Sequence, residues 1–393
     1  MAVRFCLPVG AITGIIQAMK RGDSRQARAP DRPATGRKPR AIGGVTLDAW
    51  RRLYELGDRI RDLAPWRWIG EDEYFGVEVP DATPPVWLVT FLGGIHREFF
   101  ACTAYAGWEA LRDALAVQAS DSADDAIRIL EIPHLQAAFT DRRYLYPAEK
   151  RAVRAIGRTY AGPHDWPVFR DFRAGYLPWP VNASQAHVLT AVLNQALGIA
   201  LRVEDDRRLL QTRPGAYIFR VPDGAGGWRD EWRETPALPE PVLTIGVDAA
   251  AARTLRQART LAFEVEVDLV LTQGTVRPGT GQRPQTLYML AVVDAVSGHV
   301  HGAEVMQATD GNVAAMWAQV PDTVVRLWQR MGGCPRQANV RSDRMMNVLR
   351  PLTEMFPFRL TRRQQLPGFD RFHQGLDAFL SRPPTPNGSS APP

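Results

Sequence analysis

Phe263–Thr272 has the sequence FEVEVDLVLT, in which apolar and polar side chains alternate. Successive side chains of a β-strand point to opposite faces, so the alternation predicts a strand with one buried face. A Gly- and Pro-rich loop then leads to Thr286–Asp294 (TLYMLAVVD), whose nearly continuous apolar character is typical of a central strand. Turn residues at Asp294–Gly298 precede a third predicted strand, His299–Met306. Three strands joined by short loops are therefore expected here.

Downstream of these strands, helical and strand patterns alternate. Asn312–Met331 has apolar residues near the helical period, and Pro321 inside it predicts a kink or a break. The further predicted elements are a strand at Gln337–Val340, a helix at Arg344–Phe356, a strand at Phe358–Thr361 and a helix at Pro367–Leu380. Strands joined by short loops pair antiparallel, whereas strands joined through a helix run parallel. Residues 240–380 are thus predicted to form an α/β domain of order βββαβαβα with a mixed five-stranded sheet.

Residues 45–235 have a different character and predict an α+β domain rich in tryptophan. The predicted helices begin after Thr46, near Trp108, at Pro147 (to Tyr160) and at Ser184 (to Ala200), with Asn182 as the cap of the last. Predicted strands lie at Tyr74–Val79, Val86–Phe91 and Glu98–Tyr105, and a hairpin at Gly215–Glu234. The aromatic and Pro-rich stretch from 162 to 182 is predicted to be a connector.

The net charge of +6 is confined to the N-terminus. Residues 1–44 carry nine Lys or Arg and two Asp, so the rest of the chain has a net charge of −1. This tail and residues 381–393 lack large apolar side chains over most of their length and are predicted to be disordered, with a short helix possible at 5–19. A basic tail can hold nucleic acid non-specifically, but the near-neutral body does not support nucleic-acid binding. The three cysteines form no CxxC pair, which indicates a reducing, cytoplasmic location.

The strand and helix order of residues 240–380 resembles the RNase H-like superfamily of transposases and integrases. Asp268 lies midway along the first strand, Asp343 ends the Val-Arg-Ser-Asp segment, and Asp370 lies in Phe-Asp-Arg-Phe-His-Gln. The resemblance implies that Asp268, Asp343 and Asp370, with Asp377 as a further candidate, are metal ligands that hold Mg²⁺ for phosphoryl transfer. The sequence departs from that pattern: Arg344 follows Asp343 where transposases carry Asn, and the last acid is Asp where they carry Glu. Without the metal, Asp268 is expected to be an exposed strand residue and Asp343 a helix N-cap.

Two further features have competing interpretations. His299 and His301 share a strand face, but no third ligand lies near them, so ordinary surface histidines are expected. Several tryptophans could line an aromatic groove for a peptide or a base, although core packing is the favoured interpretation: Trp66, Trp68, Trp87, Trp108, Trp166 and Trp179.

The whole chain also resembles uncharacterised bacterial two-domain proteins. Leu53–Leu56 with Ala64–Trp68 is similar to the start of one domain of unknown function, and Tyr288–Gly298 with Met316-Trp317 and Val340–Ser342 is similar to a second. These resemblances imply a bacterial architecture but no activity.

Two functional hypotheses follow. The favoured one is a non-catalytic interaction or regulatory protein without a cofactor, whose Trp-rich domain binds a protein partner away from membranes. The alternative is a Mg-dependent nuclease or nucleotidyl transferase that uses Asp268, Asp343 and Asp370. Arg341 and Arg344 would then neutralise substrate phosphate, and the basic tail would add non-specific affinity.

Overall fold

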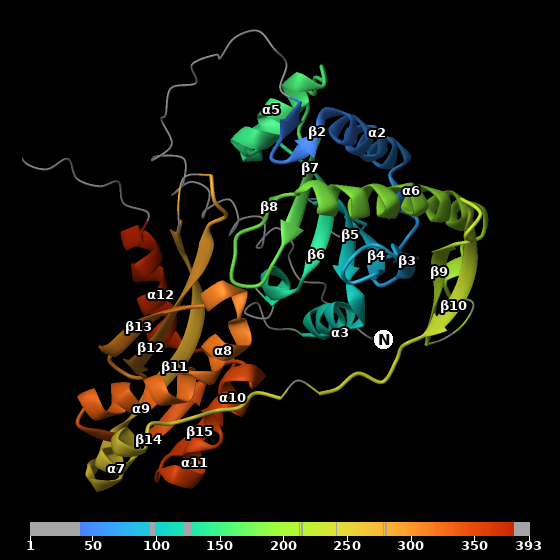
Figure 1. Cartoon of the computed structure of the whole chain (residues 1–393). Helices are drawn as coiled ribbons and strands as arrows, with labels where there is room; N and C mark the ends of the chain where they lie inside the picture. The colour runs from blue at the N-terminus through green and yellow to red at the C-terminus, as the bar shows by residue number, and fades with distance from the viewer. Residues whose placement is uncertain are drawn as a thin grey trace, which may run out of the picture. The chain divides into compact units, whose positions relative to one another are not determined.

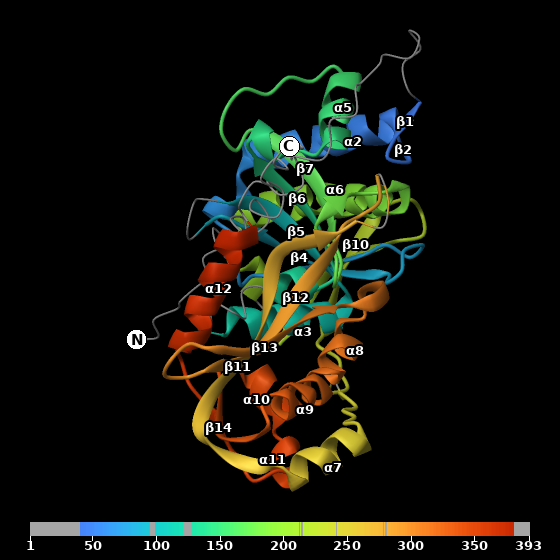
Figure 2. The same ribbon diagram turned by 90° about the vertical axis from the view of Figure 1, so that its left-hand side faces the viewer.

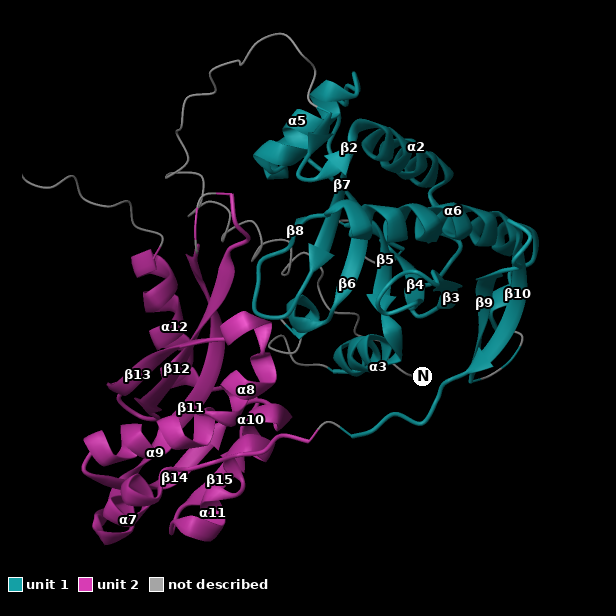
Figure 3. Cartoon of the chain, in the orientation of Figure 1, with its two compact units in different colours: residues 1–20, 26–241 teal, residues 21–25, 242–393 magenta. Residues whose placement is uncertain are grey.

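The computed structural model describes residues 40–380 except 95–98, 121–127, 212, 214, 241, 278 and 280. The predicted helix at 5–19, most of the N-terminal tail and the C-terminal tail lie outside the described residues. The chain divides into two compact units (Figures 1 and 3), of which unit 1 extends to residue 241 and unit 2 begins at Val242. Each unit contains its own β-sheet.

Unit 1 is built on an eight-stranded sheet. All neighbouring strands pair antiparallel except β3 and β9, which are parallel. In sheet order the strands are β10 (Trp228–Glu234), β9 (Ala216–Pro222), β3 (Phe75–Glu78), β4 (Val86–Leu92), β5 (Phe100–Ala106), β6 (His134–Thr140), β7 (Trp166–Phe172) and β8 (Trp179–Pro180).

Helices cover both faces of this sheet. On one face α2 and α6 pack against each other and, with the sheet, enclose the larger core, which contains Trp50, Tyr54 and Phe169. On the other face α3 packs on Leu88 and Phe219. The helices are α2 (Leu47–Leu63), α3 (Gly107–Gln118), α5 (Pro147–Ala155) and α6 (Ala183–Asp205), with 3₁₀ turns η1 (Pro65–Arg67), η2 (Arg128–Glu131), η3 (Arg142–Tyr144) and η4 (Leu209–Gln211).

Helix α6 is, among the described residues, the one helix long and apolar enough to cross a membrane by length and composition. Most of its apolar window is buried inside unit 1. This burial is the usual situation of a core helix. Its N-cap is Asn182, as predicted: the side chain accepts a hydrogen bond from Gln185 N at 3.0 Å and thereby satisfies one open backbone donor.

The predicted disorder of residues 1–44 is wrong at its C-terminal end. Residues Ala41–Ile42 (β1) and Val45–Thr46 (β2) form a small hairpin. Gly43 and Gly44 turn it with φ of 62° and 81°, values that glycine adopts without a steric penalty. The hairpin is fixed to the core because Trp50 Nε1 donates to Ile42 O at 3.1 Å.

Three strands and two helix ends of unit 1 differ from the sequence predictions; among them, β8 lies in the predicted connector, and α6 ends at Asp205 and not at Ala200. The strand β6 was not predicted, and β7 lies within the stretch predicted to be a connector. Pro167 and the mixed polarity of β7 conceal a strand whose apolar residues pack on α2. Helix α5 ends at Ala155 and not at Tyr160, because Gly157 adopts a φ of 75° and turns the chain away.

Unit 2 contains the predicted mixed five-stranded sheet, in the order β13-β12-β11-β14-β15. As predicted, strands joined by short loops are antiparallel (β11 with β12, β12 with β13) and those joined through helices are parallel (β11 with β14, β14 with β15). The strands are β11 (Arg259–Val276), β12 (Gln285–Asp294), β13 (Val300–Gln307), β14 (Gly333–Val340) and β15 (Arg359–Arg362).

The helices of unit 2 confirm the predicted break near Pro321. One helix ends at Ala318 and the next starts at Val320, with Pro321 in its first turn, where a missing N–H costs nothing. The predicted helix Arg344–Phe356 is likewise divided, beside Pro351, and one helix before β11 was not predicted. The elements are α7 (Ala249–Gln257), η5 (Thr309–Gly311), α8 (Val313–Ala318), α9 (Val320–Arg330), α10 (Asp343–Leu349), α11 (Leu352–Met355) and α12 (Pro367–Leu380).

The sheet of unit 2 is covered on both faces (Figure 2). Helix α12 packs on β11 and β12, where Phe369 is fully buried against Val270 and Val293. Helix α9 packs on the opposite face, where the Leu327 side chain lies over Gly302 of β13. The face under α12 also carries Asp268 of β11, one of the four acidic residues that the sequence singled out.

Replacing Gly76 by Ala tests the tight packing of the unit 1 sheet. A Cβ at Gly76 would lie 2.2 Å from the Phe219 ring on the adjacent strand β9. Overpacking of this kind costs about 1–3 kcal/mol. We expect Gly76→Ala to lower the free energy of unfolding by that amount in urea denaturation. The control is Gly198→Ala in helix α6, where nothing lies within 4 Å of the new Cβ and helix propensity should add about 0.5–1 kcal/mol. Equal effects of the two substitutions would contradict this packing.

Candidate functional site

A row of polar side chains lies between β11 and β14, and most of its members are buried. Glu266 pairs with Asn339 across these parallel strands, and Asp268 and Arg341 are two residues further along on each side. Glu266, Asp268 and Asn339 are each less than 5% exposed, so the interpretation of Asp268 as an exposed strand residue is wrong. Burial of a charge is unfavourable unless an opposite charge or hydrogen bonds accompany it, so the partners of these residues determine what the row can do.

Arg341 brings two of the predicted ligands together. Its Nε lies 3.4 Å from Asp268 Oδ2, and its Nη2 donates to Asp370 Oδ1 at 2.5 Å. The Asp268 side chain is only 5% exposed, whereas that of Asp370 is 38% exposed. One guanidinium therefore forms ion pairs with an acid of the central strand and with an acid of α12.

Asp343 is held differently from the other two acids. It is the first residue of α10, and its side chain is 72% exposed beside Arg362 Nη1 at 3.2 Å. The interpretation of Asp343 as an N-cap is wrong by one residue, since Ser342 Oγ accepts the hydrogen bond from Met345 N. Asp343 instead contributes negative charge to the first turn, where the helix dipole favours it.

A second arginine links Asp343 to the first two acids. Arg362 Nε donates to the backbone oxygen of Arg341 at 3.1 Å while its Nη1 faces Asp343. The three predicted ligands therefore belong to one network, and arginines connect them. Asp377, the further candidate, lies about two helical turns beyond Asp370 on α12. Its Oδ2 is 3.7 Å from His373 Nε2.

Glu266 belongs to the same row, and the sequence analysis missed it. Its carboxylate accepts a hydrogen bond from Phe369 N at 2.7 Å, in the first turn of α12. Burial raises the pKa of Glu266, and the backbone N–H groups of Gly368 and Phe369 partly oppose that rise. The sequence pattern could have identified Glu266. Glu264, Glu266 and Asp268 occupy alternate positions of Phe263–Thr272 and must share one face of the strand.

The described residues contain no group of three His, Cys, Asp or Glu side chains that could hold a metal ion. A two-metal site needs several carboxylates around ions about 3.5–4 Å apart. Here the positive charge between Asp268 and Asp370 comes from Arg341 instead. The donor set of this row does not fit two Mg²⁺ ions.

The histidine and tryptophan candidates are dispersed. His301 stacks on Phe263 with the ring centroids 4.9 Å apart, and burial and His299 lower its pKa. Trp66 and Trp87 are core residues, as the favoured interpretation predicted, and Trp108 packs on Phe219 across the other face of the sheet. Trp68 and Trp166 pack against the larger core, and Trp179 lies beside Tyr146. These side chains do not form one aromatic groove.

Comparison with known proteins agrees with the two-domain description. Residues 50–220 match the family model of a domain of unknown function (DUF7309), and residues 251–377 match that of a second domain of unknown function (DUF6930). No curated protein matches the chain significantly. The two matches fall in unit 1 and unit 2, respectively.

Replacing Arg341 by Met tests whether its charge stabilises unit 2. Removal of one partner of a buried ion pair leaves an uncompensated charge, which costs about 3–5 kcal/mol. We expect a loss near 3 kcal/mol in the free energy of unfolding, because the Arg341 side chain is still 20% exposed. Asp268→Asn in the same background should recover part of this loss, since the two sites are coupled.

The matched control for this prediction is Arg362→Met. Arg362 and Asp343 are 53% and 72% exposed, and solvent screens such a pair, so the loss should stay below about 1 kcal/mol. Equal losses in the two variants would contradict the assigned role of Arg341.

Glu266→Gln should change the pH dependence of stability. Because the folded pKa of Glu266 lies above that of the unfolded chain, the folded state binds more protons between the two values. The wild type should therefore lose stability relative to Glu266→Gln as the pH rises from about 4 through the raised pKa. Urea denaturation between pH 4 and pH 8 measures the difference. A difference that stays constant, or that favours the wild type as pH rises, would exclude a raised pKa.

Proposed function

We propose that the protein is a non-catalytic interaction or regulatory protein whose unit 2 is an RNase H-like scaffold. The observation that carries this proposal is the position of Arg341, whose guanidinium bridges Asp268 and Asp370. In a phosphoryl-transfer site these carboxylates would need to be available to cations. Here Arg341 forms an ion pair with each of them, and the network joins the central strand to α12 and to the end of β14.

The sheet of unit 2 supports the RNase H-like part of the proposal. Its central strand is β11, which is flanked by the antiparallel β12 on one side and the parallel β14 on the other, as in the order expected for that superfamily. A fold does not imply an activity, because function resides in the site that the fold carries. We infer a scaffold that has kept acidic positions and uses them for stability.

The alternative is a Mg-dependent nuclease or nucleotidyl transferase that uses Asp268, Asp343 and Asp370. One observation favours it: Arg341 and Arg362 connect all three acids within one network. For this activity Arg341 would have to leave the space between Asp268 and Asp370. The cost of uncovering the buried Asp268 weighs against that movement.

A cytoplasmic protein partner completes the proposal. Cys102 and Cys334 are free and buried, which agrees with a reducing compartment. Burial raises the pKa of the Cys334 thiol to about 12, so the reactive thiolate is suppressed at neutral pH.

Metal titration of the full chain distinguishes the two functions. A ligand present at 100 times its Kd stabilises the folded state by about 2.7 kcal/mol. We expect millimolar Mg²⁺ or Mn²⁺ to leave the thermal unfolding midpoint unchanged, and we expect no hydrolysis of single- or double-stranded DNA or RNA. The control is Asp268→Asn. Metal-dependent cleavage that disappears in Asp268→Asn would establish the alternative and refute the scaffold.

A further inference from the structure

Unit 1 contains a pocket with a basic lining, far along the chain from the acidic network. The pocket has a volume of about 820 Å³ and lies between helix α5 and the segment that leads to Trp166. Five basic side chains line it, and Asp141 is the one acidic residue among its described lining residues. The basic residues are Arg142, Arg143, Lys150, Arg154 and Arg158.

Two of the five cations already have carboxylate partners. Arg158 is hydrogen-bonded to Asp58, and Arg143 Nη2 lies 3.0 Å from Asp141 Oδ2. The other three, Arg142, Lys150 and Arg154, have no carboxylate oxygen within 4.0 Å among the described residues: Arg142 lies over the Trp166 ring, and Arg154 Nε donates only to Lys150 O of its own helix, at 3.4 Å. Three like charges without counter-ions thus border one pocket.

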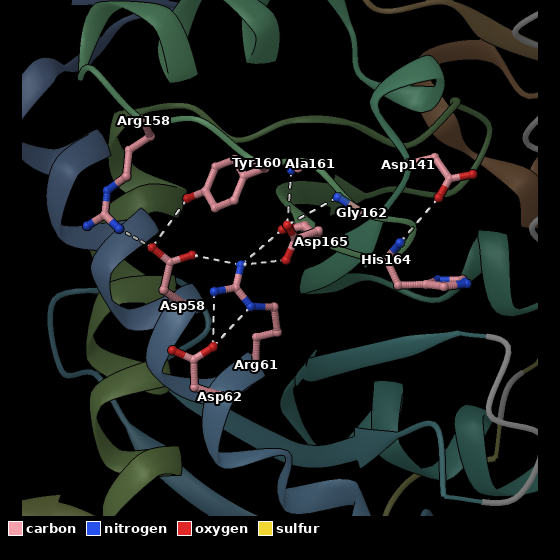
Figure 4. Close-up of polar contacts among 10 residues, drawn as sticks. All are labelled: Asp58, Arg61, Asp62, Asp141, Arg158, Tyr160, Ala161, Gly162, His164 and Asp165. Carbon is pink, nitrogen blue, oxygen red and sulfur yellow. Dashed lines mark hydrogen bonds and ion pairs between the residues drawn. The ribbon is translucent and has the colours of Figure 1, made fainter.

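The carboxylates near the pocket are engaged in holding its wall (Figure 4). Asp165 accepts hydrogen bonds from Ala161 N at 3.1 Å and Gly162 N at 3.3 Å, and Arg61 Nη1 lies 3.2 Å from its other oxygen. These donors, with the backbone N–H of Ala161 as the largest cause, lower the pKa of Asp165. Asp58 also faces Arg61, at 3.3 Å. The acids therefore fix the loop and do not neutralise the three cations.

An aromatic pair forms part of the same wall. The Tyr160 and Trp166 rings have centroids 5.5 Å apart, and both residues line the pocket. The Tyr160 hydroxyl donates to Asp58 Oδ2 at 3.3 Å, and Asp58 is also bonded to Arg158. The wall is therefore ordered before any ligand arrives, so binding requires little additional ordering.

We propose that this pocket binds a small ligand that carries two or more phosphate groups. Three cations without partners match the charge of a diphosphate, and Arg and Lys are the residues that bind phosphate oxygens in proteins. The volume lies within the range of about 300–1,000 Å³ typical of small-molecule sites. Arg142 and Arg61 lie over the Trp166 and Tyr160 rings, 6.0 and 5.7 Å from the ring centroids, so the cations and not the rings carry the recognition. The diphosphate is the group that inorganic pyrophosphate and a nucleoside diphosphate share. This site is independent of the scaffold proposed for unit 2.

Isothermal titration of the full chain with pyrophosphate, orthophosphate, ADP, adenosine and an acidic peptide tests the proposal. We expect pyrophosphate and ADP to bind more tightly than orthophosphate, and rising salt to weaken both. ADP binding above that of pyrophosphate would assign the aromatic pair to the base, and equal binding would assign the site to polyphosphate alone. An absence of pyrophosphate and ADP binding at millimolar concentration would overturn the proposal, as would preferential binding of an acidic peptide over both.

The test variant carries both Lys150→Ala and Arg154→Ala, and the matched control carries Arg151→Ala alone. Arg151 is an exposed cation on the same helix but does not line the pocket. Loss of two charge-assisted contacts should weaken pyrophosphate binding about tenfold or more, whereas Arg151→Ala should change it less than about twofold. Thermal unfolding of each variant verifies that the fold is retained. An equal loss in Arg151→Ala would show non-specific attraction and refute the pocket.

Discussion

Unit 2 depends on the burial of a carboxylate, Asp268, in the middle of its central strand. A carboxylate that is 5% exposed requires compensation, and Arg341 provides it from the end of β14. The same guanidinium reaches Asp370, so a single charge connects three elements that are distant in sequence. The backbone N–H of Phe369 adds a hydrogen bond to Glu266, which fixes the start of α12 on the same face of the sheet. The position of α12 thus follows from satisfying the acids beneath it.

Unit 1 also contains a buried carboxylate that an arginine compensates. Glu149 is almost fully buried, and Arg170 of β7 donates to both of its oxygens, at 3.0 and 3.1 Å. Glu149 also accepts from Tyr146 N at 2.6 Å, so one carboxylate caps α5 and attaches it to the sheet. Helix α5 is therefore anchored through its buried side while its cations stay on the pocket side. Because the Glu149–Arg170 pair attaches α5 to the sheet, the backbone that carries Lys150 and Arg154 is held in place beside the pocket.

The sequence predicted the elements whose pattern is local. Alternation along Phe263–Thr272 and Pro321 near the helix break helped to derive the order of unit 2 and its mixed sheet. In unit 1, the capping residues Thr46 and Asn182 located the starts of α2 and α6. The sequence did not predict β6 or β7, because their pairing with distant strands determines them and not their own composition. It named Asp268 and Asp370 but assigned Arg341 to substrate phosphate and not to these two acids, because an ion pair across 73 residues has no periodic signal.

The net charge of the folded body does not describe the local charge at the pocket of unit 1, for a related reason. The body sums to −1, and that sum argued against an anionic partner. The sum counts each acid once, wherever it lies, but Asp58 and Asp165 are already bonded behind the pocket wall and cannot neutralise Arg142, Lys150 or Arg154. A ligand responds to the charge within about one Debye length, roughly 8 Å at physiological salt, and not to the total. Pairing in the folded state therefore decides which charges a partner meets, and a near-neutral body can still present a strongly basic site.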